Sequence, residues 1–169
     1  MSDFISPVYN VKAVPIEKVH ANSYNPNSVA TPEMKLLYDS ILNDGYTMPI
    51  VTYYIKENDT YEIVDGFHRY SIMRLHKDIY ERENGMLPIV VIDKPLSERM
   101  ASTIRHNRAR GSHDVDLMSN IVGELHELGK TDKWIMKHLG MDADEVLRLK
   151  QLSGLASLFK DKDFSKGWE

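Results

Sequence analysis

An abrupt change of hydrophobic period at Asp65-Gly66 constrains the fold of this chain more than any other feature. Before it, Ile50–Ile55 and residues 61–64 are rich in β-branched and aromatic residues and are separated by a turn, which predicts a β-hairpin. After it, apolar residues recur at helical spacing as far as Leu75. A strand that leads through a glycine directly into a helix exposes backbone N–H groups at the helix start, which is typical of an anion-binding site.

The side chains around this turn are suited to phosphate. Gly66 allows the backbone to approach a ligand closely, and Arg69 offers a forked donor. His68 can donate to a phosphate oxygen or transfer protons, while Asp65 can take a proton or hold Mg²⁺. Asp65 and His68 are therefore the candidate catalytic residues. Because Asp-Gly is also common in ordinary turns, an unremarkable turn with a surface arginine explains the same residues.

A second segment favours the phosphate interpretation. The fifteen residues from Arg99 to His113 contain no aspartate or glutamate, although the chain has a formal net charge of −4. An uncompensated basic segment in an acidic chain indicates an anionic partner, and a solvated helix end is the alternative. We expect the segment to face the Asp65–Arg69 turn and to bind phosphate. Its candidate ligands are Arg105, Asn107, Arg108, Arg110 and His113.

Composition limits the remaining classes of protein. A length of 169 residues with 42% hydrophobic residues allows one domain, or one domain with a small appendage. The absence of cysteine excludes disulfides, thiolate zinc sites and cysteine nucleophiles. No signal peptide is visible after Met1, and no apolar run approaches the roughly 20 residues that span a bilayer. We therefore expect a cytoplasmic protein without a membrane partner.

The pattern of periodicity predicts a mixed α/β part followed by an all-α part. Residues 10–20 alternate as in an edge strand, residues 31–44 are helical up to a stop at Gly45, and residues 87–93 form a third strand. Leu96–Asn107 is helical. The expected divisions are 1–113 for the α/β domain, 114–159 for the helical segment and 160–169 for a flexible tail.

Residues 131–152 resemble a helix-turn-helix, in which Thr131 caps one helix and Gly140 ends it before the next begins. Its expected core is Ile135, Leu139, Val146 and Leu149. The candidate DNA contacts are Lys133, Lys137, Arg148 and Lys150. From Asn120 to Ser153, however, six acidic and five basic residues give a charge of −1, a weak footprint for DNA. A helical cap or a homodimerisation element is the alternative.

From Val14 to His113 the chain resembles the ParB/sulfiredoxin-like superfamily. The stretch Ser40–Ile50, which includes Gly45, resembles the family's first nucleotide-binding stretch. Gly66-Phe67-His68-Arg69 stands where ParB proteins carry the phosphate-binding Gly-Glu-Arg-Arg. His106–Arg110 stands where they carry Glu-Asn-x-x-Arg, which holds triphosphate and metal. The resemblance thus implies nucleotide contacts at Gly45 and Phe67 and an Mg²⁺ contact at Asn107.

The departures from this pattern leave the reaction open. Phe67 and His106 replace acidic residues of ParB, and His68 replaces an arginine. Asp65–Arg69 also resembles the Asp-Gly-x-His-Arg of ADP-dependent free serine kinases, which makes a small-molecule phosphotransferase the alternative. Sulfiredoxin chemistry is excluded because it needs a cysteine. A nuclease needs a carboxylate cluster, for which Asp114 and Asp116 are the reserve candidates.

The overall likeness is to the IbrB/YbdM-type group of ParB-domain proteins, through the strings at Asp65–Tyr70 and Asn107–His113. It implies an α+β nucleotide-binding domain with a small mixed sheet, followed by a helix-turn-helix-like segment. It also implies a nucleotide ligand (ATP, ADP or CTP), a DNA-associated or transcriptional role and a phosphoadenosine-phosphosulfate-reductase-like partner. Our main hypothesis is a nucleotide-binding regulator with weak nucleoside triphosphate hydrolysis.

Overall fold

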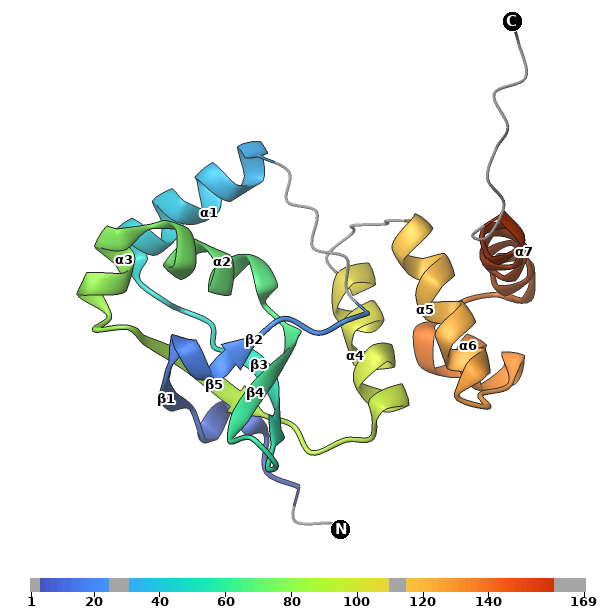
Figure 1. Ribbon diagram of the computed structural model, residues 1–169, viewed down its shortest axis with the longest axis horizontal. Coiled ribbons are helices and arrows are strands. Elements are labelled where there is room, and N and C mark those ends of the chain that lie inside the picture. The colour runs from blue at the N-terminus through green and yellow to red at the C-terminus, as the bar shows by residue number, and fades with distance from the viewer. Residues whose placement is uncertain (1–3, 25–30, 110–114, 160–169) are drawn as a thin grey trace, which may run out of the picture. The chain divides into compact units, whose positions relative to one another are not determined.

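The computed structural model describes residues 4–24, 31–109 and 115–159 (Figure 1). It divides into two compact units, Met1–Pro95 and Leu96–Glu169. This division lies at the start of α4 (Leu96–Ala109), whereas the sequence analysis expected a boundary at residues 113–114. The helical unit includes α4 because that helix packs against α5 (Val115–Glu127) and α6 (Asp132–Leu139).

The first unit is built on a five-stranded mixed sheet of order β1-β5-β3-β4-β2. Its strands are β1 (Lys12–Pro15), β2 (Val19–His20), β3 (Ile50–Ile55), β4 (Thr60–Asp65) and β5 (Met86–Val91). The predicted hairpin is present as the antiparallel pair β3 and β4, and β5 lies parallel to β3 on its other side. The α+β class and the small mixed sheet expected from the sequence are therefore confirmed.

The segment expected to form one edge strand forms both edges of the sheet. β1 pairs with β5 at one edge and β2 pairs with β4 at the other, and only the short helix η2 (Ile16–Lys18) separates them. A flat sheet of five strands is about 19 Å wide at about 4.8 Å per strand. The four residue steps from Pro15 to Val19 reach at most about 14 Å. The sheet must therefore curl, which brings its two edges together.

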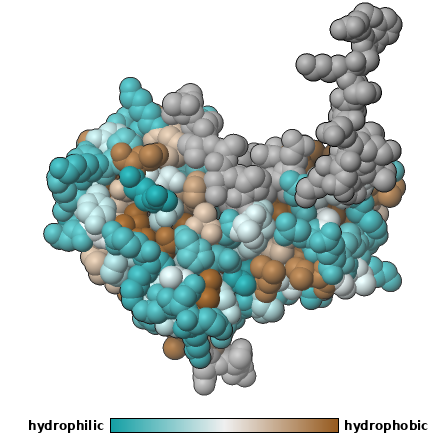
Figure 2. Space-filling view, viewed as in Figure 1, coloured by the Kyte–Doolittle hydropathy of each residue, from teal (hydrophilic) through white to brown (hydrophobic). Residues whose placement is uncertain are grey.

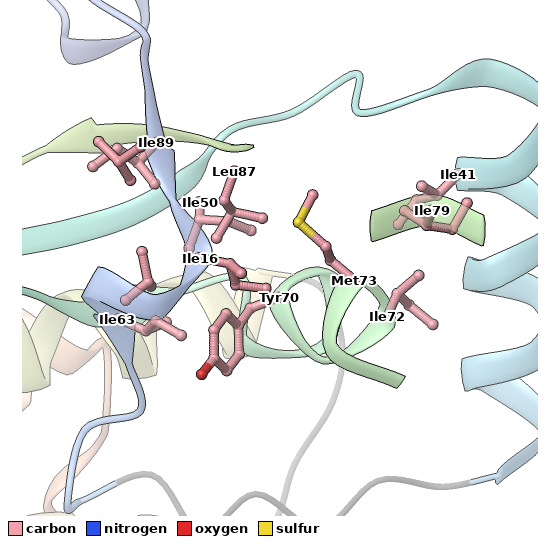
Figure 3. Packing of buried hydrophobic residues seen from close by; sticks show 12 residues of the cluster. Ile16, Ile41, Ile50, Ile63, Tyr70, Ile72, Met73, Ile79, Leu87 and Ile89 are labelled. Atoms are coloured by element: carbon pink, nitrogen blue, oxygen red, sulfur yellow. The ribbon is translucent and has the colours of Figure 1, made fainter. Parts of the chain in front are cut away.

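Three helices and the sheet enclose the core of this unit. α1 (Thr31–Asp44), α2 (Phe67–Leu75) and α3 (Lys77–Arg82) lie together on the same side of the strands (Figure 1). Isoleucines from the three helices and from the sheet meet in the core, together with Tyr70, Met73 and Leu87 (Figure 3). The helix α3 had no counterpart in the sequence analysis. It begins after His76, whose φ of −118° and ψ of 106° interrupt the helical path.

The second unit contains α4, α5, α6 and α7 (Ala143–Phe159). The four residues expected in the helix-turn-helix core are all buried. Thr131 caps α6 by accepting a hydrogen bond from the Trp134 backbone N–H at 3.2 Å, and Gly140 ends it with a φ of 68°. Leu128, just beyond the end of α5, is 44% exposed.

The molecular face seen in Figure 2 is mostly hydrophilic, with apolar residues in separate patches. Large exposed apolar residues are most concentrated near the N-terminus, where they are Phe4, Ile5, Val8, Tyr9 and Val11. Within the described part of the chain, none of the helices has the length and apolar character needed to cross a bilayer.

Candidate functional site

A β-bulge at the end of β4 places Asp65. The register of the hairpin pairs Val51 with Asp65 but Thr52 with Ile63, so Val64 is the extra residue on β4. An extra residue breaks the alternation of side chains and commonly redirects one of them at a functional site. As a result Ile63, Val64 and Asp65 are all buried in succession, and Asp65 is only 7% exposed.

Gly66 forms the turn from β4 into α2. Its φ of 98° and ψ of 22° lie in the left-handed region, where residues with a side chain are strained. A Cβ at this position would lie 2.9 Å from the Arg69 Nη2 and 3.0 Å from the Ile50 Cδ1. The turn therefore requires glycine for two reasons, its backbone angles and the close approach of the Arg69 side chain.

The guanidinium of Arg69 folds back over this turn. Its Nη1 donates to the backbone oxygens of Met48 and Pro49, each at 2.8 Å. Its Nη2 donates to the Asp65 carboxylate at 3.4 Å, and both side chains are about nine-tenths buried. Arg69 thus joins two of the three predicted motifs, the stretch that ends at Pro49-Ile50 and the Asp65–Arg69 turn. Sequence reasoning missed the carbonyls of Met48 and Pro49, because backbone acceptors carry no residue signature.

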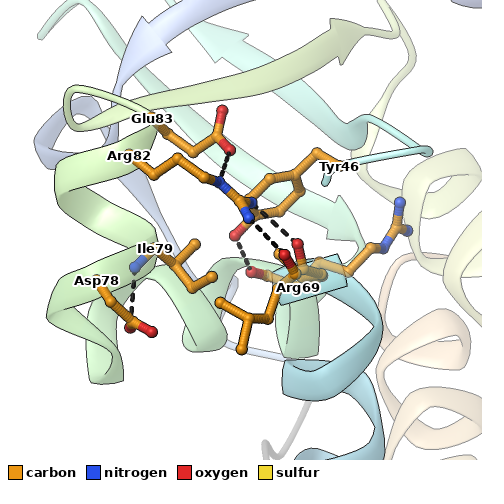
Figure 4. Close-up of polar contacts among 8 residues, drawn as sticks. Tyr46, Arg69, Asp78, Ile79, Arg82 and Glu83 are labelled. Atoms are coloured by element: carbon orange, nitrogen blue, oxygen red, sulfur yellow. Dashed lines mark hydrogen bonds and ion pairs between the residues drawn. The ribbon is translucent and has the colours of Figure 1, made fainter. Parts of the chain in front are cut away.

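Tyr46 ties the same two motifs from the other side. Its hydroxyl donates to the backbone oxygen of Arg69 at 2.8 Å (Figure 4), and burial, with the Glu83 carboxylate nearby, raises the pKa of Tyr46 above its usual range. Arg82 holds α1, the helix that precedes Tyr46. It donates to two of the last carbonyls of that helix, Ile41 at 2.9 Å and Leu42 at 3.0 Å. The segment after Gly45 is therefore anchored at several points. Tyr46 is not among the candidate site residues that the sequence predicts.

Replacing Tyr46 with phenylalanine should destabilise the first unit by about 0.5–1.5 kcal/mol at neutral pH, the usual net value of one hydrogen bond. Because the folded-state pKa of Tyr46 is raised, its contribution is complete below the unfolded pKa of about 10 and is lost as pH rises further. Urea unfolding of both proteins from pH 7 to pH 11 should show the difference shrinking above pH 10. A constant difference over that range would contradict this assignment.

His68 and Phe67 occupy the first turn of α2. His68 is exposed, while Phe67 is half-buried and packs against the core of the sheet unit. Their rings are 6.2 Å apart in an edge-on arrangement. α2 has no acidic residue in its first turn, so the positive end of its dipole is not neutralised from within the helix. The expected proton-transfer roles of Asp65 and His68 stay predictions.

The predicted basic clamp lies in the second unit or outside the described residues. Arg105 donates through Nη1 to the His138 oxygen at 3.0 Å and so caps the C-terminal end of α6. The side chains of Asn107 and Arg108, the residues Arg110, His113 and Asp114, and the side chain of Asp116 lie outside the described part. Their expected approach to Arg69 therefore stays a prediction, as does Mg²⁺ binding by Asp65 and Asn107. Among the described residues, no group of three or more His, Asp or Glu could share a metal ion.

Comparison with known proteins decides the family. Residues 5–79 match the model of the ParB N-terminal domain, and residues 113–161 match the IbrB-like C-terminal HTH domain. YbdM of Escherichia coli (strain K12) is 49% identical to the chain over 162 residues, which cover 96% of this chain and 77% of YbdM. The chain belongs to the YbdM family of ParB-like proteins.

Solved structures support the same fold. The C-terminally truncated chromosome-partitioning protein ParB from Caulobacter crescentus, complexed with CTP-gamma-S, has a TM-score of 0.50 at 19% identity, covering 89% of this chain and 83% of that one. The same protein complexed to the centromeric parS site has a TM-score of 0.54 at 18% identity, covering 83% and 71%. At these identities the likeness shows the fold, and the expected ParB-like fold is confirmed.

The IbrB-like helix-turn-helix of this YbdM-family protein presents its basic residues unevenly. Lys133 and Lys137 are exposed one turn apart on α6. Lys150 is paired with Asp132, its Nζ lying 3.1 Å and 3.2 Å from the two carboxylate oxygens. Arg148 is exposed on α7. The charge of Lys150, one of the four expected DNA contacts, is therefore offset by an acidic neighbour.

Proposed function

We propose that this protein binds a nucleoside triphosphate with the Asp65–Arg69 turn. The bound nucleotide then controls DNA binding by the helix-turn-helix domain. The observation that carries the proposal is the start of α2. There, Gly66 in the left-handed conformation turns the chain into a helix with an acid-free first turn and an exposed His68. Such a helix start binds phosphate through its N–H groups and its dipole.

CTP is the nucleotide that the comparisons favour. The ParB of Caulobacter crescentus, which shares the fold, was crystallised with CTP-gamma-S. The replacements at Phe67 and His68 change the side chains beside the phosphate motif, so ATP and ADP are the competing ligands. Slow hydrolysis of the triphosphate belongs to the same proposal.

Calorimetric titration of the full chain with CTP, ATP and ADP, with and without Mg²⁺, tests nucleotide binding. His68→Ala should weaken the affinity about 10- to 100-fold, since a hydrogen bond to a charged group is worth about 1.5–3 kcal/mol. Leu75→Ala is the control, because it shortens a 72%-exposed side chain at the opposite end of α2. Release of inorganic phosphate measures hydrolysis. Wild-type protein that binds none of the three at millimolar concentration ends the proposal.

DNA binding is tested by its dependence on salt. Each phosphate contact releases counterions, so removing one lysine that contacts a phosphate should reduce the slope of log K against log salt by about 1. Fluorescence anisotropy with duplex DNA should show this for Lys133→Ala and for Lys137→Ala. Lys56→Ala removes the same charge from the β3–β4 turn and should leave the slope unchanged. Equal slopes for all four proteins would remove the α6 lysines from the DNA interface.

A further inference from the structure

We propose that Arg69 is a positioning residue that clamps the two nucleotide-binding stretches together, and that it is not itself a phosphate ligand. This inference rests on the proposed function and assigns a different role to the arginine of that site. The sequence motif indicates a phosphate contact, whereas the described geometry directs the guanidinium toward the protein backbone.

The guanidinium N–H groups of Arg69 donate to acceptors within the protein. A guanidinium has five N–H donors in a rigid fork, and it grips phosphate with two parallel N–H groups. Both N–H groups of Nη1 are matched by the oxygens of Met48 and Pro49, at 2.8 Å each, and Nη2 contacts the Asp65 carboxylate. Turning toward a phosphate would break two short hydrogen bonds and would leave a buried carboxylate without this partner, which costs free energy.

Arg69 is hydrogen-bonded to the same loop through two groups, its guanidinium and its backbone oxygen. Its guanidinium donates to the end of the 46–49 segment, and its backbone oxygen accepts from the Tyr46 hydroxyl at the start of that segment. In Figure 4 the Tyr46 hydroxyl points at the Arg69 carbonyl, while the Arg69 side chain extends the opposite way. A connection through both ends fixes the loop relative to the first turn of α2, which is the geometry that a bound phosphate needs.

Charge supports the same role for Arg69. The Asp65 carboxylate directly precedes the turn at which the anion would bind, and its side chain is only 8% exposed. A buried negative charge beside a phosphate weakens binding unless a cation offsets it. Arg69 offsets Asp65, and so it favours the anion without touching it. Gly66 completes the arrangement, because a Cβ there would collide with the guanidinium at 2.9 Å.

Amide hydrogen exchange of the nucleotide-free full chain tests the clamp apart from any ligand contact. In Arg69→Ala and Arg69→Lys we expect exchange in the peptide covering residues 45–52 to rise at least tenfold. Leu75→Ala is the matched control, since this side chain is 72% exposed at the far end of the same helix and its loss should leave the exchange unchanged. Circular dichroism shows which variants are folded. Tyr46→Phe removes the hydrogen bond at the other end of the loop and should also raise exchange in this peptide.

Nucleotide affinity of the same variants completes the experiment. Both Arg69 variants should bind at least tenfold more weakly, because one ammonium cannot hold two carbonyls and a carboxylate at once. Unchanged exchange in Arg69→Ala, or near-wild-type affinity in Arg69→Lys, would overturn the clamp and restore a direct phosphate contact. If wild-type protein binds no nucleotide, the proposed function fails, while the exchange data still decide whether Arg69 holds the loop.

Discussion

Replacing Gly66 with alanine should destabilise the first unit by about 2–6 kcal/mol and abolish nucleotide binding. A residue with a Cβ held at a φ of 98° costs about 1–3 kcal/mol in backbone strain. The added carbon would also meet the Arg69 Nη2 at 2.9 Å and the Ile50 Cδ1 at 3.0 Å, and such overpacking costs about 1–3 kcal/mol more. To relieve it, the guanidinium must leave the oxygens of Met48 and Pro49.

Gly45→Ala provides a matched control for this prediction. Gly45 also has a positive φ, 75°, but a Cβ there would meet no atom within 4 Å. This variant should lose only the backbone strain, about 1–2 kcal/mol. Urea unfolding of the two variants measures the difference in stability, and nucleotide titration of Gly66→Ala measures the loss of binding. Losses of equal size would show that the crowding at Gly66 contributes nothing.

Replacing Ile135 with alanine should destabilise the helical unit by about 2–5 kcal/mol, the usual cost of an isoleucine-sized cavity. Ile135 is fully buried on α6, a helix that packs against α4 and α7. Its loss removes contacts that hold the helix-turn-helix together. Urea unfolding followed by tryptophan fluorescence reports on this region, because Trp134 lies next to it on α6. DNA affinity should fall in parallel.

Leu147→Ala is the control within the same unit. Leu147 is 54% exposed on α7, so truncating it should change stability by no more than about 0.5 kcal/mol. A large loss in Leu147→Ala, or a negligible one in Ile135→Ala, would contradict the packing described for the helix-turn-helix. Both variants should keep their nucleotide affinity if the ligand is held by the first unit.

The basic pattern of the sequence did not predict the hydrogen-bond acceptors of Arg69 and Arg105. Both arginines were expected to bind phosphate because each stands in a basic or glycine-containing motif. In the structure each donates to backbone carbonyls, Arg69 to Met48 and Pro49 and Arg105 to His138. Such acceptors occur at every residue, so no spacing of side chains reveals them in advance.

Local chemistry determined much of this protein from its sequence alone. The hairpin, the glycine turn at residue 66, the helix-turn-helix with its Thr131 cap and its buried core, and the ParB-like fold were all predicted. Each depends on residues close together in the chain, where periodicity, caps and glycine angles act directly. The motif order along the chain was enough to predict the family.

Tertiary structure alone decided the arrangement of the site. It split residues 12–20 between opposite edges of a curled sheet, because the strands they join lie far apart in sequence. It placed a bulge at Val64 that buries Asp65, and it turned Arg69 toward carbonyls some twenty residues earlier in the chain. These features arise when distant segments compete for the same hydrogen bonds and the same space, and neither periodicity nor composition records that competition.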